Sequence, residues 1–256
     1  MFTAIDQLLV CRDTTDLETL RASGDLQERY DTKYVLNLAT AVEVLEILDR
    51  NWKVLQVDRE RFTAYQSSYY DDQDLVLFHD HIMGRRLRYK VRTRRYGNEP
   101  DEMLEIKLKS GRGGTIKRRI QRTVAFGTEL TNVERQWISD TILDDYGRRP
   151  ESALKYTLGL NYTRRTMFNS VSGERLTIDS GVVAEADCGT ATPIGDAVVI
   201  EMKSVVWTCP TVRLLHRHCI RPVNFSKYCA ALAALHPELN QQARSRAERS
   251  LARLQT

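Results

Sequence analysis

Residues 86–94 read Arg-Leu-Arg-Tyr-Lys-Val-Arg-Thr-Arg, with a cation at every second position. Side chains alternate between the two faces of a β-strand, so Arg86, Arg88, Lys90, Arg92 and Arg94 would all lie on one face of a strand. Neighbouring cations repel one another, and such a face therefore needs either a polyanionic partner or full exposure to solvent. For this segment taken alone, a solvated edge strand is the stronger interpretation.

The same two-residue alternation of polar residues recurs along the chain. An ordinary half-buried strand also alternates, so each repeat is a weak signal by itself. Several strands that each carry charges on one face predict a shared charged surface, and in a closed sheet that surface would be a lumen lined by cations and carboxylates. The repeats are Arg29, Asp31 and Lys33; Glu105, Lys107 and Lys109; Tyr162 and Arg164; Arg175, Thr177 and Asp179; and Glu201 and Lys203.

The positive charge is concentrated in one part of the sequence. The 256 residues carry a net charge of only +4, whereas residues 85–122 hold 14 Lys or Arg against 4 Asp or Glu. The rest of the chain is therefore slightly acidic. A local excess of this kind favours a phosphate-rich ligand over diffuse adhesion to nucleic acid or membrane.

The cysteines and the hydropathy of the chain indicate the cellular compartment of the protein. The five cysteines are scattered and contain no C-x-x-C pair, which argues against a disulfide framework or a structural zinc site and favours a reducing compartment. No apolar segment approaches the length of a membrane span. We expect a cytoplasmic protein that does not insert into a membrane itself.

The chain reads as a single domain over residues 1–256, with a core at about 25–235. Apolar spacing predicts a helix over 40–50, capped by Thr40, and a helix over 132–146, while a basic helix is expected over 237–254. The segment GRGGT at 111–115 favours a hairpin connection, because it lacks the G-x-x-x-x-G-K-[ST] pattern of a phosphate-binding loop. Strands are predicted at 29–36, 65–70, 85–96, 102–109, 115–124, 154–168, 174–179 and 197–207.

A succession of short motifs spans residues 29 to 230: RYDTKY at 29–34, YQSSYYDD at 65–72, KVRTRRYG at 90–97, LEIKLK at 104–109, KRR at 117–119, NYTRR at 161–165, ERLTID at 174–179, VIEMK at 199–203 and FSKY at 225–228. In this order they resemble the VTC domain, the polyphosphate-polymerase branch of the triphosphate tunnel metalloenzymes. The resemblance implies an α+β fold, an antiparallel β-barrel tunnel with helices packed around the outside.

The resemblance also implies roles for individual residues. Lys227 would lie near the transferring phosphoryl group together with Arg92 and Arg94, and Glu201, with Glu105 as a second candidate, would hold Mn²⁺ or Mg²⁺. The side chains that would contact phosphate oxygens, besides Arg92 and Arg94, are Lys33, Lys90, Lys107, Lys117, Arg119, Arg164, Arg175 and Lys203.

The chemistry of phosphoryl transfer agrees with these residue roles, but it leaves open whether each carboxylate binds a metal or pairs with a cation. Phosphoryl transfer needs in-line positioning and neutralisation of phosphate oxygens, which cations and a metal supply. A carboxylate among these cations would bind a hard metal or pair with a neighbouring cation; metal binding is favoured for Glu201 and ion pairing for Glu105. His216 and His218 would share a face in an extended segment, but packing is favoured over metal binding because a third ligand is missing.

Three functions follow from these expectations. The first is a metal-dependent polyphosphate polymerase that transfers the γ-phosphate of ATP to a growing chain. The second is an inorganic or nucleoside triphosphatase, and the third is a non-catalytic module that binds polyphosphate and docks on a membrane protein partner. A specific nucleic-acid partner is disfavoured, because the basic strands lack aromatic residues interleaved on the same face.

Overall fold

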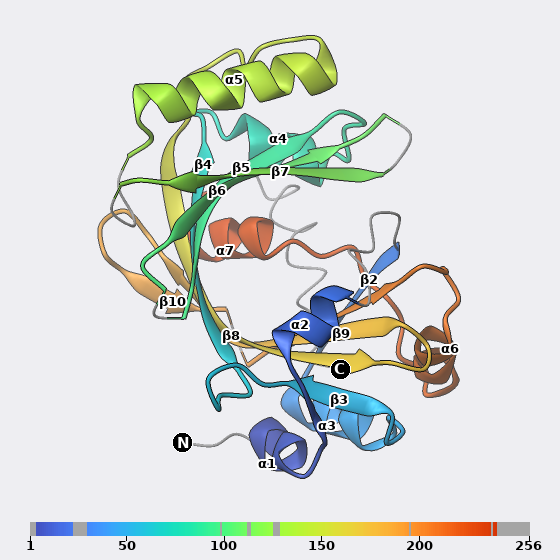
Figure 1. The fold of residues 1–256 in the computed structure, drawn as a ribbon. Coiled ribbons are helices and arrows are strands. Elements are labelled where there is room, and N and C mark those ends of the chain that lie inside the picture. The colour runs from blue at the N-terminus through green and yellow to red at the C-terminus, as the bar shows by residue number, and fades with distance from the viewer. Residues whose placement is uncertain are drawn as a thin grey trace.

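The computed structural model describes residues 4–22, 30–97, 99–111, 114–124, 129–194, 196–236 and 238–239. These residues form one curled sheet with helices on both of its faces (Figure 1). The helices are α1 (Ala4–Val10), α2 (Leu17–Ala22), α3 (Leu38–Glu46), α4 (Val76–Ile82), α5 (Asn132–Tyr146), α6 (Pro210–Arg217) and α7 (Lys227–Leu235). The strands are β1 (Thr14–Thr15), β2 (Tyr30–Leu36), β3 (Trp52–Leu55), β4 (Thr63–Asp71), β5 (Tyr89–Tyr96), β6 (Glu102–Lys109), β7 (Thr115–Arg122), β8 (Lys155–Asn169), β9 (Glu174–Glu185), β10 (Ala191–Pro193) and β11 (Val198–Ser204).

The main path of the sheet is β2-β11-β9-β8-β4-β5-β6-β7, and every neighbouring pair along it is antiparallel. The 15-residue strand β8 joins the two halves, because it pairs with β4 along its first part and with β9 along most of its length. Register shifts interrupt both pairings, and such bulges bend a strand and increase its twist. The sheet therefore curls into the half-barrel seen in Figure 1, and the expected α+β fold with an antiparallel, tunnel-like sheet is confirmed.

Apolar residues cover the outer face of the curl, as the alternation predicts. In β6, Leu104, Ile106 and Leu108 are fully buried in a cluster that includes Ile138 and Ile142 of α5. The outer face of the other half packs against α1, α3 and α6 through a second cluster. Burial on this scale is the main favourable term in folding, so the outer face anchors the strands whose inner face is charged.

Helix α7 differs from the other helices because it lies inside the curl (Figure 1). Its residues from Tyr228 to Ala233 are all at most 2% exposed. They pack against the apolar part of the inner face, which includes Val35, Tyr162 and Val199. The sequence KYCAALAAL is rich in alanine, and these small side chains let the helix pack closely against β8 and β9.

The basic strand is shorter than the sequence predicts. It begins at Tyr89 rather than at residue 85, so Arg86 and Arg88 precede the strand and only Lys90, Arg92 and Arg94 share its inner face. The reason is local: the chain turns back after α4, and the Arg85 amide donates to the Asp80 carbonyl at 2.9 Å.

Other boundaries also shift or are confirmed. Helix α3 is capped by Asn37, which accepts from the Thr40 amide at 2.8 Å, so Thr40 lies within the helix instead of capping it. His216 lies in α6 and His218 ends it, and the two do not share a strand face.

Helix α5 and the β6–β7 hairpin are confirmed, the latter with a 2.9 Å hydrogen bond from the Ser110 amide to the Gly114 carbonyl. The helix predicted over 237–254 lies outside the described residues, apart from 238–239.

A buried ion network fastens α5 to the edge of the sheet. Arg122 at the end of β7 is fully buried and donates to Glu134 Oε1 at 2.6 Å and to Glu102 Oε2 at 2.9 Å. Glu134 also completes the capping box of α5 with Thr131. Removal of this one guanidinium would leave two carboxylates uncompensated inside the protein.

We therefore predict that Arg122→Met lowers the free energy of unfolding by about 3–5 kcal/mol, measured by urea denaturation. The matched control is Arg118→Met on the same strand, whose partner Asp145 lies in an exposed pair and whose loss should cost less than about 1 kcal/mol. Equal effects of the two substitutions would contradict this account of the network.

Candidate active site

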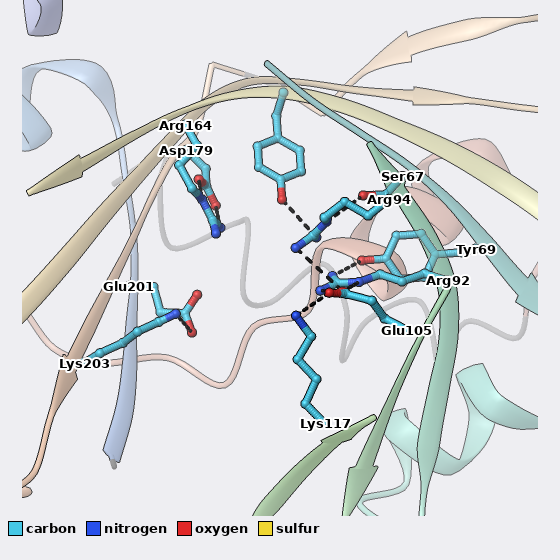
Figure 2. Close-up of polar contacts among 11 residues, drawn as sticks. Ser67, Tyr69, Arg92, Arg94, Glu105, Lys117, Arg164, Asp179, Glu201 and Lys203 are labelled. Atoms are coloured by element: carbon cyan, nitrogen blue, oxygen red, sulfur yellow. Dashed lines mark hydrogen bonds and ion pairs between the residues drawn. The ribbon is translucent and has the colours of Figure 1, made fainter. Parts of the chain in front are cut away.

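Strand register places the charged residues of both halves on the inner face of the curl. Residues paired directly across an antiparallel ladder share a face. Figure 2 shows the side chains of the two halves projecting into the same space. The pairs are Glu201 with Lys33 and Thr177, Lys203 with Asp31 and Arg175, Arg164 with Asp179, Arg92 with Glu105, Glu105 with Arg119, and Lys107 with Lys90 and Lys117.

Glu105 organises the cations of β5 to β7. Its Oε2 accepts from Arg92 Nη2 at 2.7 Å and lies 4.0 Å from Arg94 Nη1, while its Oε1 pairs with Lys117. Burial would raise the pKa of Glu105, but the charges of Arg92, Arg94 and Lys117 outweigh it and lower the pKa to about 2. The carboxylate thus stays ionised and holds three cations in fixed positions (Figure 2).

Hydroxyl groups orient the two arginines of β5 further. Arg92 Nη1 donates to the Tyr69 hydroxyl at 3.1 Å, and Arg94 donates to Ser67 Oγ and to the Tyr162 hydroxyl, both at 3.1 Å. A guanidinium carries five N–H donors in a rigid plane, more than the hydrogen bonds described for Arg92 and Arg94 use. Arg92 and Arg94 are therefore candidate phosphate ligands.

Asp179 plays the same role on the other half of the sheet. Arg164 donates to its two oxygens at 2.6 and 2.7 Å, and Lys227 Nζ donates to Oδ2 at 2.5 Å. Burial would raise the pKa of Asp179, but Arg164 and Lys227 lower it to about 2. Lys227 Nζ also lies 4.8 Å from the ring centroid of Tyr162. The lysine expected near the transferring phosphoryl group is thereby placed among the inner-face cations.

Glu201 is the carboxylate best suited to a metal. Its Oε1 pairs with Lys203 Nζ at 3.2 Å, and despite burial its pKa lies well below the ordinary value because of Lys203, Lys33, Arg164 and Lys107. Within the described part of the chain, no three His, Cys, Asp or Glu side chains gather into a metal site. Mg²⁺ is usually held by one or two carboxylates together with substrate phosphates. Glu201 fits that mode, whereas both oxygens of Glu105 are engaged by cations.

Two of the predicted phosphate ligands contact the start of α7. Lys33 Nζ donates to the Phe225 carbonyl at 2.9 Å, and Lys90 Nζ donates to Ser226 Oγ at 2.9 Å. Burial and neighbouring cations lower the pKa of Lys90 to about 7 and that of Lys107 to about 8. Charges on β2 contribute to both shifts, so the curl brings β2 close to β5 and β6.

The remaining predicted ligands lie toward the margins of the inner face. Arg119 shares the face of Glu105 but is exposed. Arg175 Nη2 donates to the Leu20 carbonyl of α2 at 3.1 Å, so this guanidinium also orders the N-terminal segment. The structure thus brings Arg92, Arg94 and Lys117 together around Glu105, and Arg164 and Lys227 around Asp179.

Comparison with known protein families identifies the family to which this chain belongs. The VTC domain matches residues 28–236 of the chain. The chain belongs to the VTC domain family. The inner-face cations described above are those that the family resemblance singled out. No curated protein matches the chain at a significant level.

Solved structures similar to this VTC domain are distant. The PH1819 protein of Pyrococcus horikoshii OT3 is 15% identical with a TM-score of 0.44, over 82% of this chain and 99% of that protein. HpAC1 from Hippeastrum, named as an adenylyl cyclase and reported with a dominant triphosphatase activity, is 14% identical with a TM-score of 0.45, over 83% of this chain and 97% of that one. These likenesses are too remote to assign a residue or an activity. Among the described residues of the VTC domain, no helix is both long and apolar enough to cross a bilayer.

Sequence reasoning missed several residues of this site. Ser226, His81 and Tyr69 each contact an inner-face cation, yet none of them belongs to a charged repeat. Asp179 was noticed only as part of an alternating segment, although it holds both Arg164 and Lys227. Ser226 and Tyr69 do lie within the motifs FSKY and YQSSYYDD, and serine is a preferred N-cap residue.

Acid should weaken the VTC domain through its inner-face carboxylates. Glu105 and Asp179 have pKa values of about 2 when folded, below the ordinary values of 4.5 and 3.8. A depressed pKa contributes stability that is present above the unfolded value and lost as the pH falls toward the folded value. We predict that the free energy of unfolding falls between about pH 4.5 and 2.

Glu105→Gln should remove part of this acid dependence, because glutamine has no charge to lose. The variant is expected to be less stable than the wild type at neutral pH and to approach it at about pH 3, as measured by urea denaturation at several pH values. The exposed Glu151→Gln is the matched control and should leave the profile unchanged. A constant difference between Glu105→Gln and the wild type at every pH would contradict the assigned role.

Proposed function

We propose that this VTC domain is a metal-dependent polyphosphate polymerase that transfers the γ-phosphate of ATP to the end of a polyphosphate chain held on the inner face. The observation that carries the proposal is the pairing of three groups of inner-face cations with strongly acidic carboxylates, Glu105, Asp179 and Glu201. These carboxylates hold their partner cations in separate positions along the curl, as an extended polyanion requires.

The residues supply positioning and charge neutralisation. A terminal oxygen of the chain would attack the γ-phosphorus and form the new P–O bond, while the bond to the β,γ-bridging oxygen breaks and ADP leaves with its electron pair. Arg92, Arg94 and Arg164 would neutralise phosphate oxygens, and Lys227 would stabilise the transferring group. A divalent cation bound by Glu201 would add a further positive charge at the phosphates.

The inner-face carboxylates are poorly suited to activate water for hydrolysis. Hydrolysis is helped by a base that removes a proton from the attacking water, and an efficient base has a pKa near the working pH. The pKa values of Glu105 and Asp179 are about 2, and that of Glu201 is well below its ordinary value, so these carboxylates are poor bases at neutral pH. A terminal phosphate oxygen is already anionic at neutral pH and needs no such help.

The test is incubation of the purified chain with ATP and Mn²⁺, with products resolved by gel and by ³¹P NMR. We expect polyphosphate chains and ADP. Lys227→Met and Glu201→Gln should each reduce chain formation by about 10²-fold, the size of effect seen when one group that stabilises transition-state charge is lost. Lys155→Met, at an exposed position where β8 begins, serves as the matched lysine control and should retain full activity.

Two outcomes would overturn the proposal. Orthophosphate without chains would identify a triphosphatase. Tight binding of tripolyphosphate without turnover of ATP, with either Mn²⁺ or Mg²⁺, would identify a binding module.

A further inference from the structure

The segment directly before Lys227 is held by two lysines from strands that are distant in the sheet. Lys33 of β2 donates to the Phe225 carbonyl and Lys90 of β5 donates to Ser226 Oγ, both at 2.9 Å. Strand β2 lies at one end of the sheet path, and β5 lies third from the other end. The start of α7 therefore bridges the two halves of the curl.

Ser226 is the N-cap of α7, and Lys227 is its first helical residue. The Ser226 hydroxyl accepts from the Cys229 amide at 3.4 Å, a long bond, and from Lys90 Nζ at 2.9 Å. The direction in which a helix begins fixes where its first side chain points. Whatever holds the Ser226 hydroxyl in place therefore also directs Lys227 toward Asp179, to which it donates at 2.5 Å.

A second contact orients Lys90 itself. Its Nζ lies 3.0 Å from His81 Nδ1 on α4. Burial, together with the charges of Lys90 and Arg88, lowers the pKa of His81 to about 2, so the imidazole is neutral at physiological pH and can accept from Lys90. The Lys90 side-chain nitrogen is thus held by two partners, His81 and Ser226.

We propose that Lys90 is a positioning residue, which fixes the N-terminus of α7 through the Ser226 hydroxyl and so directs Lys227 at the phosphoryl group, and that it is not itself a phosphate ligand. This differs from the role that the family resemblance implies for Lys90. The role in turnover rests on the proposed function, whereas the structural coupling between Lys90, Ser226 and Lys227 does not.

The test is a double-mutant cycle in which chain formation and tripolyphosphate binding are measured for Lys90→Met, Ser226→Ala and the double variant. Each single change should lower kcat by about tenfold to 10²-fold, since a displaced group costs this much. The double variant should lose no more than either single variant, because one hydrogen bond is removed only once. Ser226→Thr keeps the hydroxyl and should restore kcat.

Binding measurements distinguish a positioning role of Lys90 from direct contact between Lys90 and phosphate. Calorimetric titration with tripolyphosphate should give a Kd for Ser226→Ala within about threefold of the wild type. Lys107→Met, which removes the inner-face cation opposite Lys90 on β6, should weaken binding by about tenfold or more. Additive losses in kcat would overturn the proposal. An unchanged kcat in Ser226→Ala, together with a Kd for Lys90→Met as weak as that of Lys107→Met, would also overturn it. Lys90→Gln replaces Lys90→Met if circular dichroism shows that the latter fails to fold.

A measurement that does not require turnover distinguishes failure of this proposal from failure of the proposed function. If the chain does not use ATP, acetylation of Lys227 by acetic anhydride, followed by peptide mass spectrometry, reports the position of its amine. Lys90→Met and Ser226→Ala should both increase the labelling rate of Lys227 by a similar factor, and Ser226→Thr should not. Labelling that stays at the wild-type rate in both variants would show that neither residue holds Lys227.

Discussion

Repulsion among the inner-face cations is the constraint on which the structure depends. Lysines and arginines from both halves of the sheet are brought within electrostatic range of one another, and burial together with these neighbouring charges lowers the pKa values of Lys90 and Lys107. Three carboxylates offset part of this repulsion, and the apolar clusters on the outer face supply the stability that holds the strands together. A polyanion on the inner face would relieve the remaining repulsion and stabilise the fold by mass action.

The carboxylates fall into two kinds. Glu105 and Asp179 are engaged by cations at both oxygens, and they serve to orient Arg92, Lys117, Arg164 and Lys227. The ion pair described for Glu201, with Lys203, involves one oxygen. Of the three carboxylates, Glu201 is therefore the best suited to the divalent cation of the proposed function. The same difference accounts for the separate outcomes expected from Glu105→Gln, which acts on stability, and Glu201→Gln, which acts on catalysis.

The parts of the structure that could be predicted are those with a local signal. Alternation in LEIKLK placed Leu104, Ile106 and Leu108 on the buried face and Glu105 and Lys107 on the other, which the structure confirms. The start of the basic strand at Tyr89 was not predictable from alternation, because the turn after α4 decides it. The contact between Lys90 and Ser226 joins residues 136 positions apart, and such a contact leaves no periodic trace in the sequence. The placement of α7 inside the curl had no signal beyond its small side chains.

The most direct test of the central claim is a crystal structure of the chain with tripolyphosphate. The account predicts that the phosphates lie on the inner face, within hydrogen-bonding distance of Arg92, Arg94 and Arg164, with Lys227 directed at one end of the chain. Tripolyphosphate bound to the outer surface, or an inner face without phosphate in crystals saturated with the ligand, would contradict it.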